Sequence, residues 1–172
     1  HIPEILYRWR IHESSSGHAR MHEVMETSKS VLCRHLDRCG KAGEVNDGPS
    51  FNFFDTRYPL GQGAHVAIII PTHNHPELVR ACIESIERTV HHAACDIVLV
   101  DHASDDHDAL AYFEALAGRA AVIRYEGPFN FSALNNWAVR QIDQTYTHYL
   151  FCNNDVEAIQ DGWLERMLEL CQ

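Results

Sequence analysis

Four short polar segments of the chain carry side chains that can bind a ligand. They are PTHNH at 71–75, DHASDD at 101–106, GPFNFS at 127–132 and NND at 153–155. Together they offer amide and hydroxyl groups for hydrogen bonding, and carboxylates for a hard cation such as Mg²⁺ or Mn²⁺. If the fold brings them together, the four segments suit a nucleotide bound with a divalent ion.

Each polar segment follows an apolar run of the kind that forms a buried strand. The runs cover 66–70, 97–100, 121–125 and 149–152. Stretches with helical periodicity separate them, starting near 76, from 108 to 116, after 132 and from 162 to 171. This alternation indicates an α/β fold, a Rossmann-like parallel sheet with helices on both faces. Right-handed crossovers place the loops after all four strands on one edge, where such sheets bind their ligands.

The first 63 residues follow a different pattern. One helix is expected at 18–39, with Gly40 as its C-terminal stop. Its apolar stripe is formed by Met21, Met25, Leu32 and Leu36. A homodimer through this helix would cover the stripe. Residues 41–63 are rich in glycine and proline and are expected to be a linker with one short strand, before a domain at 64–172.

The composition narrows the class of protein. The chain has 172 residues, with 14 Lys and Arg against 24 Asp and Glu, and a formal net charge of −10. This balance argues against nucleic acid as a partner, since duplex binding needs a basic face. The six cysteines contain no C-x-x-C pair, which favours reduced thiols in a cytoplasmic protein over a disulfide framework or a zinc site. The sequence contains no run of about 18 apolar residues, so it predicts no membrane-spanning helix.

Two common nucleotide-binding motifs are absent from the sequence. No G-x-G-x-x-G follows the first apolar run, and no G-x-x-x-x-G-K-[ST] occurs anywhere. Instead, IIIPTHN at 68–74, VDHASDD at 100–106, FNFSALNN at 129–136 and NND at 153–155 together resemble family 2 glycosyltransferases. The resemblance covers about 64–172. It implies the GT-A fold and inverting transfer of a sugar from a nucleoside diphosphate sugar.

The resemblance also implies a set of functional residues. Those expected to bind the nucleotide sugar are Pro71, Thr72, Asn74, Asp101, Ser104, Asp106, Asn135 and Asn154. Among them, Asp101 would accept a hydrogen bond from a ring N–H of the base. The metal ligands would be Asp155, the last acid of the family's D-x-D motif, and Asn153. The ion, Mg²⁺ or Mn²⁺, would offset charge on the leaving diphosphate.

The sequence departs from the family's pattern in two places. The metal motif keeps only one acid, Asp155, and an amide oxygen at 153 or 154 can coordinate a cation but adds no charge. The family's catalytic base lies further downstream of this motif than the 17 residues that follow Asp155. The catalytic residue is therefore unknown, and the chain is expected to be an inactive fragment that binds its donor weakly.

A second, shorter resemblance lies at the start of the chain. Residues 2–12, IPEILYRWRIH, resemble the segment after the acceptor site in the same family, and the chain begins at His1 without a Met. These features predict that 1–40 is the tail of an upstream domain in a tandem enzyme of bacterial surface-polysaccharide synthesis. Such an enzyme would use a saccharide or lipid-linked saccharide acceptor, at the inner face of the membrane.

Other interpretations of these residues stay open at this point. Asp101 could simply cap a turn, and the NND segment at 153–155 could be an ordinary turn between strand and helix. The chain could be a degenerate interaction module that keeps the fold without the chemistry. A nucleotidyltransferase is a further alternative, but it would need a basic, glycine-rich loop after the first strand, which 71–75 does not offer.

Overall fold

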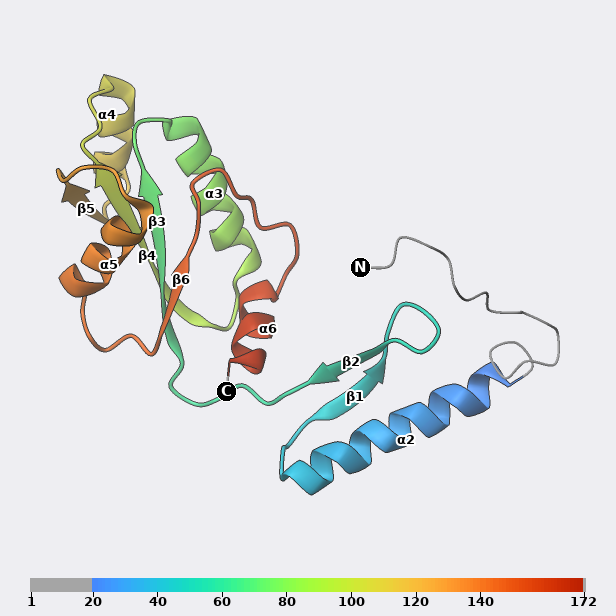
Figure 1. The fold of residues 1–172 in the computed structure, drawn as a ribbon. Coiled ribbons are helices and arrows are strands. Elements are labelled where there is room, and N and C mark those ends of the chain that lie inside the picture. Colours follow the sequence, from blue (N-terminus) through green and yellow to red (C-terminus); the bar gives the residue numbers. More distant parts are fainter. Residues whose placement is uncertain (1–19, 172) are drawn as a thin grey trace, which may run out of the picture. The chain divides into compact units, whose positions relative to one another are not determined.

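The computed structural model describes residues 20–171 of the chain (Figure 1). The chain divides into two compact units, His1–Pro59 and Leu60–Gln172. The segment at 2–12 that resembles the family lies outside the described residues. No helix between residues 20 and 171 combines the length and the hydropathy that a membrane span needs.

The described part of the first unit contains one helix and a two-stranded hairpin. Helix α2 spans Met21–Cys39 and ends at Gly40, whose φ of 61° is the left-handed conformation that ends many helices. Strands β1 (Glu44–Asp47) and β2 (Phe54–Arg57) pair antiparallel. Residues 41–63 therefore hold two paired strands, where the sequence suggested one.

The second unit alternates strands and helices along the chain, as the apolar runs predicted. Its strands are β3 (His65–Thr72), β4 (Ala94–His102), β5 (Ala121–Tyr125) and β6 (His148–Phe151). Its helices are α3 (Pro76–Thr89), α4 (His107–Ala115), α5 (Phe131–Gln141) and α6 (Trp163–Leu170). The strands form one sheet in the order β5-β4-β3-β6, and every neighbouring pair is parallel. The predicted α/β fold with a parallel sheet is confirmed.

Both faces of the sheet are covered, which explains why its central strands are apolar along most of their length. On one face Ile68, Ile70 and Leu99 pack with the apolar sides of α3, α4 and α6. On the other face Ile69 and Val100 pack against α5. Because successive side chains of a strand point to opposite faces, a strand covered on both sides needs apolar residues at every position.

Strand β3 runs two residues further than the apolar run at 66–70 suggested. Pro71 and Thr72 pair with β4, although the proline was expected to end the strand. The carbonyl of Ile69 accepts from the N–H of Cys152 at 2.9 Å, so the backbone groups of Ile69 point towards β6. The backbone of Pro71, two residues later, points to the same side, but β6 has already ended at Phe151. A proline fits there because its missing N–H has no partner strand to meet.

Helix α5 begins two residues earlier than expected. The sequence suggested Ser132 as its N-cap, but Asn130 takes that position with an extended backbone at φ −150°. Its Oδ1 accepts from the N–H of Ala133 at 2.9 Å. Both residue types cap helices well, so the sequence alone did not separate the two.

Candidate functional site

A cavity of about 330 Å³ opens at the carboxyl edge of the sheet. The chain places β4 on one side of β3 and β6 on the other, so the strand order reverses at β3. A reversal of this kind leaves a crevice between the loops of the flanking strands. The lining residues are Pro71, Thr72, His73, His102, Phe129, Phe131, Leu134, Asn153 and Asn154. All four polar segments of the sequence therefore contribute to one cavity.

Thr72 and Asn154 join the two sides of this reversal. The Nδ2 of Asn154, in the loop after β6, donates to the Oγ1 of buried Thr72 at 3.0 Å. The Thr72 hydroxyl donates in turn to the carbonyl of Asn74 at 3.0 Å. No other described residue bonds to the side-chain amide of Asn154, so its oxygen and its second N–H remain for a ligand.

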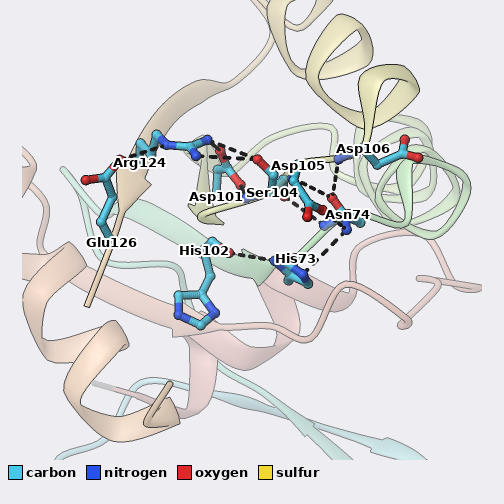
Figure 2. A network of polar contacts seen from close by, with 9 residues as sticks. All are labelled: His73, Asn74, Asp101, His102, Ser104, Asp105, Asp106, Arg124 and Glu126. Carbon is cyan, nitrogen blue, oxygen red and sulfur yellow. Dashed lines mark hydrogen bonds and ion pairs between the residues drawn. The ribbon is translucent and has the colours of Figure 1, made fainter. Parts of the chain in front are cut away.

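Asn74 fastens the loop after β3 to the loop after β4 (Figure 2). Its φ is 58°, a left-handed conformation that asparagine tolerates better than most residues. Its N–H donates to the Ser104 Oγ at 2.7 Å, and its Oδ1 accepts from the N–H groups of Asp105 and Asp106 at 3.1 and 3.0 Å. Its Nδ2 donates to the Asp105 Oδ1 at 2.9 Å. Asn74 thus shapes the loops around the cavity without lining it.

Asp101 is 3% exposed at the end of β4. Its Oδ1 accepts from the N–H of Ser104 at 2.8 Å, and its Oδ2 pairs with the Nη1 of Arg124 on β5 at 2.7 Å. The same guanidinium lies 3.3 Å from the Glu126 carboxylate. Each oxygen of Asp101 therefore has an internal partner. Sequence reasoning missed Arg124, although a lone charged residue in the apolar run at 121–125 was an available signal.

The other two acids of this loop also serve the loop itself. The Oδ1 of Asp106 accepts from the N–H of Ala109 at 2.8 Å and so caps α4. The hydrogen bond from the Asn74 amide lowers the pKa of Asp105 below its ordinary value. Neither of these carboxylates, nor that of Asp101, is part of the cavity lining.

Asn135 is buried on α5, next to Leu134 of the cavity lining. Its Nδ2 donates to the carbonyl of Phe131, one turn back, at 2.9 Å. Its Oδ1 is buried and has no hydrogen-bond partner among the described residues. A buried acceptor without a donor costs free energy, so this oxygen is suited to receive a hydrogen bond from a ligand or a water molecule.

The segment Asn153-Asn154-Asp155 supplies oxygen ligands only. Asn153 lines the cavity, while Asp155 is exposed and has no hydrogen bond or salt bridge to another described residue. Between residues 20 and 171, no cluster of three or more His, Cys, Asp or Glu side chains is placed to hold a metal ion. The donor chemistry suits Mg²⁺ or Mn²⁺, but one negative charge would hold either ion weakly unless a diphosphate supplies further oxygens.

Two thiols anchor the start of this segment. The Sγ atoms of Cys82, on α3, and Cys152 lie 3.6 and 3.4 Å from the carbonyl oxygen of Asn153. A hydrogen bond with Cys152, together with burial, raises the pKa of the Cys82 thiol far above its ordinary value. The same bond lowers the pKa of Cys152. The contacts hold the backbone where the chain enters the segment.

Sequence reasoning did not single out the aromatic residues of the cavity. Those it missed are His73, His102, Phe129 and Phe131. The Nδ1–H of His73 donates to the carbonyl of His102 at 2.7 Å, and the Nε2–H of His102 donates to the carbonyl of Gly127 at 2.9 Å. These bonds assign the tautomers, because a carbonyl can only accept. The available signal was a pair of phenylalanines around Asn130 in a polar loop.

Known proteins resemble this chain over its whole length. It is 34% identical over 178 residues to protein y4gI of Sinorhizobium fredii (strain NBRC 101917 / NGR234), of which it covers 19%. It is 30% identical over 177 residues to the O-antigen biosynthesis protein RfbC of Myxococcus xanthus, of which it covers 14%. Both alignments include all of this chain. The chain thus spans less than a fifth of the length of these relatives.

Solved structures of two proteins match part of the chain or most of it. The mannosyltransferase PcManGT of Pyrobaculum calidifontis, solved with GDP-Man and Mn²⁺, matches with a TM-score of 0.50 at 16% identity, over 90% of this chain and 43% of that chain. S. aureus TarS 1-349 matches with a TM-score of 0.49 at 20% identity, over 60% of this chain and 31% of that chain. At such low identity the PcManGT match shows the fold alone.

The family itself is shown by the sequence. The sequence model described as Glycosyl transferase family 2 matches residues 67–172, which is more than half of the chain. That range includes all four polar segments and every strand that positions them, apart from the first two residues of β3. The chain belongs to glycosyl transferase family 2.

Proposed function

We propose that the cavity is the donor site of a glycosyltransferase and binds a nucleoside diphosphate sugar. The observation that carries this proposal is the hydrogen bond between Thr72 and Asn154, which joins the end of β3 to the loop after β6 across the strand reversal. Both residues belong to the segments by which the sequence resembles the family, and the family match spans them. A crevice at a strand reversal is also where open α/β sheets bind ligands.

The proposed binding residues divide into two groups. Pro71, Thr72 and Asn154 line the cavity and contact the nucleotide sugar directly. A second group holds the loops around the nucleoside, and its members are Asn74, Asp101, Ser104 and Asp106. Asp101 can still accept from a ring N–H of the base, because each carboxylate oxygen accepts up to two hydrogen bonds. The free Oδ1 of Asn135 is a further acceptor.

A divalent cation completes the proposed site. Asp155 and Asn153 would hold Mg²⁺ or Mn²⁺ together with oxygens of the diphosphate. When bound, the ion offsets the charge that develops on the leaving nucleoside diphosphate. The chain contributes only one negative charge, so we expect the ion and the nucleotide to bind together rather than separately.

The reaction proposed for the whole protein is inverting transfer of a sugar to a saccharide or lipid-linked saccharide acceptor in polysaccharide synthesis. The relative RfbC, whose name refers to O-antigen biosynthesis, supports this class of product. The family match favours this function over the nucleotidyltransferase alternative. A homodimer through α2, a cytoplasmic location and the assignment of 1–40 as the tail of an upstream domain stay predictions.

Calorimetric titration of the 172-residue chain with UDP, GDP and dTDP, each with and without Mn²⁺, tests the donor site. At least one nucleotide is expected to bind, and to bind more tightly with Mn²⁺. Asn154→Ala removes the side-chain amide of Asn154. In the wild type this amide donates to Thr72 and is also available to a ligand. We expect it to weaken nucleotide binding about tenfold, which corresponds to roughly one hydrogen bond.

The matched control is Asn136→Ala, which removes an exposed asparagine of α5 outside the cavity lining. This variant should bind like the wild type, and circular dichroism should show that both variants are folded. If the folded wild-type chain binds none of the three nucleotides, the donor site is wrong. The degenerate interaction module is then the better account.

A further inference from the structure

The cavity combines polar and aromatic residues that come from different loops. Polar side chains, among them Thr72 and Asn154, come from the end of β3 and the loop after β6. The end of β4, the loop after β5 and the start of α5 contribute His102, Phe129 and Phe131. The two phenylalanines are 69% and 45% exposed, so they present apolar rings to water beside a cavity. Removing such apolar surface from water lowers the free energy, so a ligand that covers these rings is stabilised.

His102 holds the loop that carries Phe129. Its Nε2–H donates to the carbonyl of Gly127, two residues before Phe129, and the His102 and Phe129 ring centroids lie 5.5 Å apart. The His102 ring also lies 5.7 Å from that of Tyr125. The backbone carbonyl of His102 accepts from His73 at 2.7 Å. One residue at the end of β4 therefore connects the loops after β3 and β5.

These contacts are separate from the ion pair of the neighbouring residue. Asp101 and His102 are consecutive in β4, so their side chains point to opposite faces of the sheet. Figure 2 shows the His102 ring directed away from Asp101, Ser104 and Arg124. A change at His102 can therefore alter the aromatic loop without breaking the pair of Asp101 and Arg124.

The chemistry of the expected ligand matches this division. A nucleoside diphosphate sugar has one flat aromatic part, the base, while its sugars and phosphates are polar. Stacking on an aromatic side chain stabilises a bound base and tolerates different bases. The polar residues of the cavity suit the rest of the ligand. The exposed ring of Phe129 is the surface that a base would cover.

We propose that Phe129 is a stacking platform for the base of the bound nucleotide and that His102 is its positioning residue. This inference rests on the proposed function, because it takes a nucleotide as the ligand. It adds to the site two residues that were not among the binding residues expected from the sequence. The hydrogen bond to Gly127 and the ring contact are the means by which His102 acts on Phe129.

Calorimetry with two probes tests the platform, each in the presence of Mn²⁺. The first probe is the nucleotide that the wild type binds most tightly among UDP, GDP and dTDP. The second is inorganic pyrophosphate, which has two phosphates and no base. Phe129→Ala should weaken nucleotide binding about 5- to 100-fold and leave pyrophosphate binding unchanged. Phe129→Trp should keep nucleotide binding, and the control Phe53→Ala, at a 64% exposed position of the first unit, should change neither.

The positioning role of His102 has its own test. His102→Ala should weaken nucleotide binding but not pyrophosphate binding. Added to Phe129→Ala, it should cause no further loss, because a residue that acts only through Phe129 has nothing left to act on. His102→Gln should restore part of the affinity, since its amide can still donate to the carbonyl of Gly127.

Different outcomes overturn the platform at Phe129, the positioning role of His102 and the proposed donor site. A folded Phe129→Ala chain that binds the nucleotide like the wild type, or that loses nucleotide and pyrophosphate binding equally, overturns the platform. Additive losses in the double variant overturn the positioning role of His102. A wild-type chain that binds no nucleotide contradicts the proposed function itself, which is a different result from either.

Discussion

Two acidic loops lie at the same edge of the sheet and use their carboxylates in opposite ways. In the loop at 101–106, every acid accepts a hydrogen bond from the protein itself. In the segment at 153–155, the single acid, Asp155, has no hydrogen bond or salt bridge to another described residue. In sequence the first loop looks like the stronger cation site, because it has three acids.

The comparison shows that the number of acids in a loop does not measure its capacity to bind a cation. A carboxylate that already pairs with Arg124 or caps a helix has its negative charge partly offset by that partner, so it attracts a cation less strongly. An exposed carboxylate without partners keeps its full charge for a ligand. The loop with fewer acids is therefore the better candidate for the metal.

The largest expected effect is a loss of stability in Asp101→Ala. The change leaves the N–H of buried Ser104 without its acceptor and Arg124 without its shortest contact. Breaking a buried charge pair costs about 3–5 kcal/mol, and the half-exposed Arg124 brings this one to about 2–3 kcal/mol. Urea unfolding followed by circular dichroism measures the change. Asp101→Asn should lose less, because its amide oxygen still accepts from Ser104.

The same unfolding experiment on Asp155→Asn is the matched control. No described residue bonds to this carboxylate, so the free energy of unfolding should not change. The contrast between the loops disappears if Asp101→Ala is as stable as the wild type. It also disappears if Asp155→Asn loses a comparable amount of stability.

A smaller effect on stability is expected where Asn74 fastens the first loop. Asn74→Ala removes the side-chain bonds to Asp105 and Asp106 and puts an alanine at a φ of 58°, which together should cost about 2 kcal/mol. Asn74→Gly loses the same bonds but suits the left-handed backbone, so we expect a loss of about 1 kcal/mol. Urea unfolding compares the pair, and equal losses would mean that backbone strain contributes nothing.

A change in the segment at 153–155 should alter metal-dependent nucleotide binding and leave the stability of the fold unchanged. Asp155→Asn should lower the affinity for the nucleotide about tenfold in Mn²⁺, or 1.4 kcal/mol, and should not change it without the metal. Calorimetry under both conditions measures this difference. Asp37→Asn, which changes an exposed acid of α2, is the control and should have no effect. An equal loss with and without Mn²⁺ would contradict a role for Asp155 as a metal ligand.

The smallest expected effect is a change in one pKa. The hydrogen bond from Asn74 lowers the pKa of Asp105 in the folded chain. A carboxyl group whose pKa falls on folding stabilises the fold above its ordinary pKa, and this contribution is lost as the pH falls through the folded-state value. NMR titration of the Asp105 carboxyl carbon should show the lowered pKa, and a rise of this pKa towards the ordinary value in Asn74→Ala. A pKa that stays low in Asn74→Ala would mean that another group causes the shift.

By itself the sequence determined the elements of the second unit and the edge where its ligand groups gather. Continuous apolar runs such as 66–70 mark strands that are covered on both faces, and helical periodicity marks the segments between them. The parallel arrangement followed from that alternation, and it placed the polar segments on one edge. Element ends were less certain, as Pro71 and Asn130 show, because several residue types suit such positions.

Only the tertiary structure decided which polar groups at that edge are free. Asp101 and Arg124 are 23 residues apart and meet because the register of β4 and β5 places them side by side. Thr72 and Asn154 are 82 residues apart and meet because β6 lies next to β3. Register and strand order depend on how the whole sheet packs, and no local pattern encodes them. The same packing sets the partners of Asp101 and leaves Asp155 exposed.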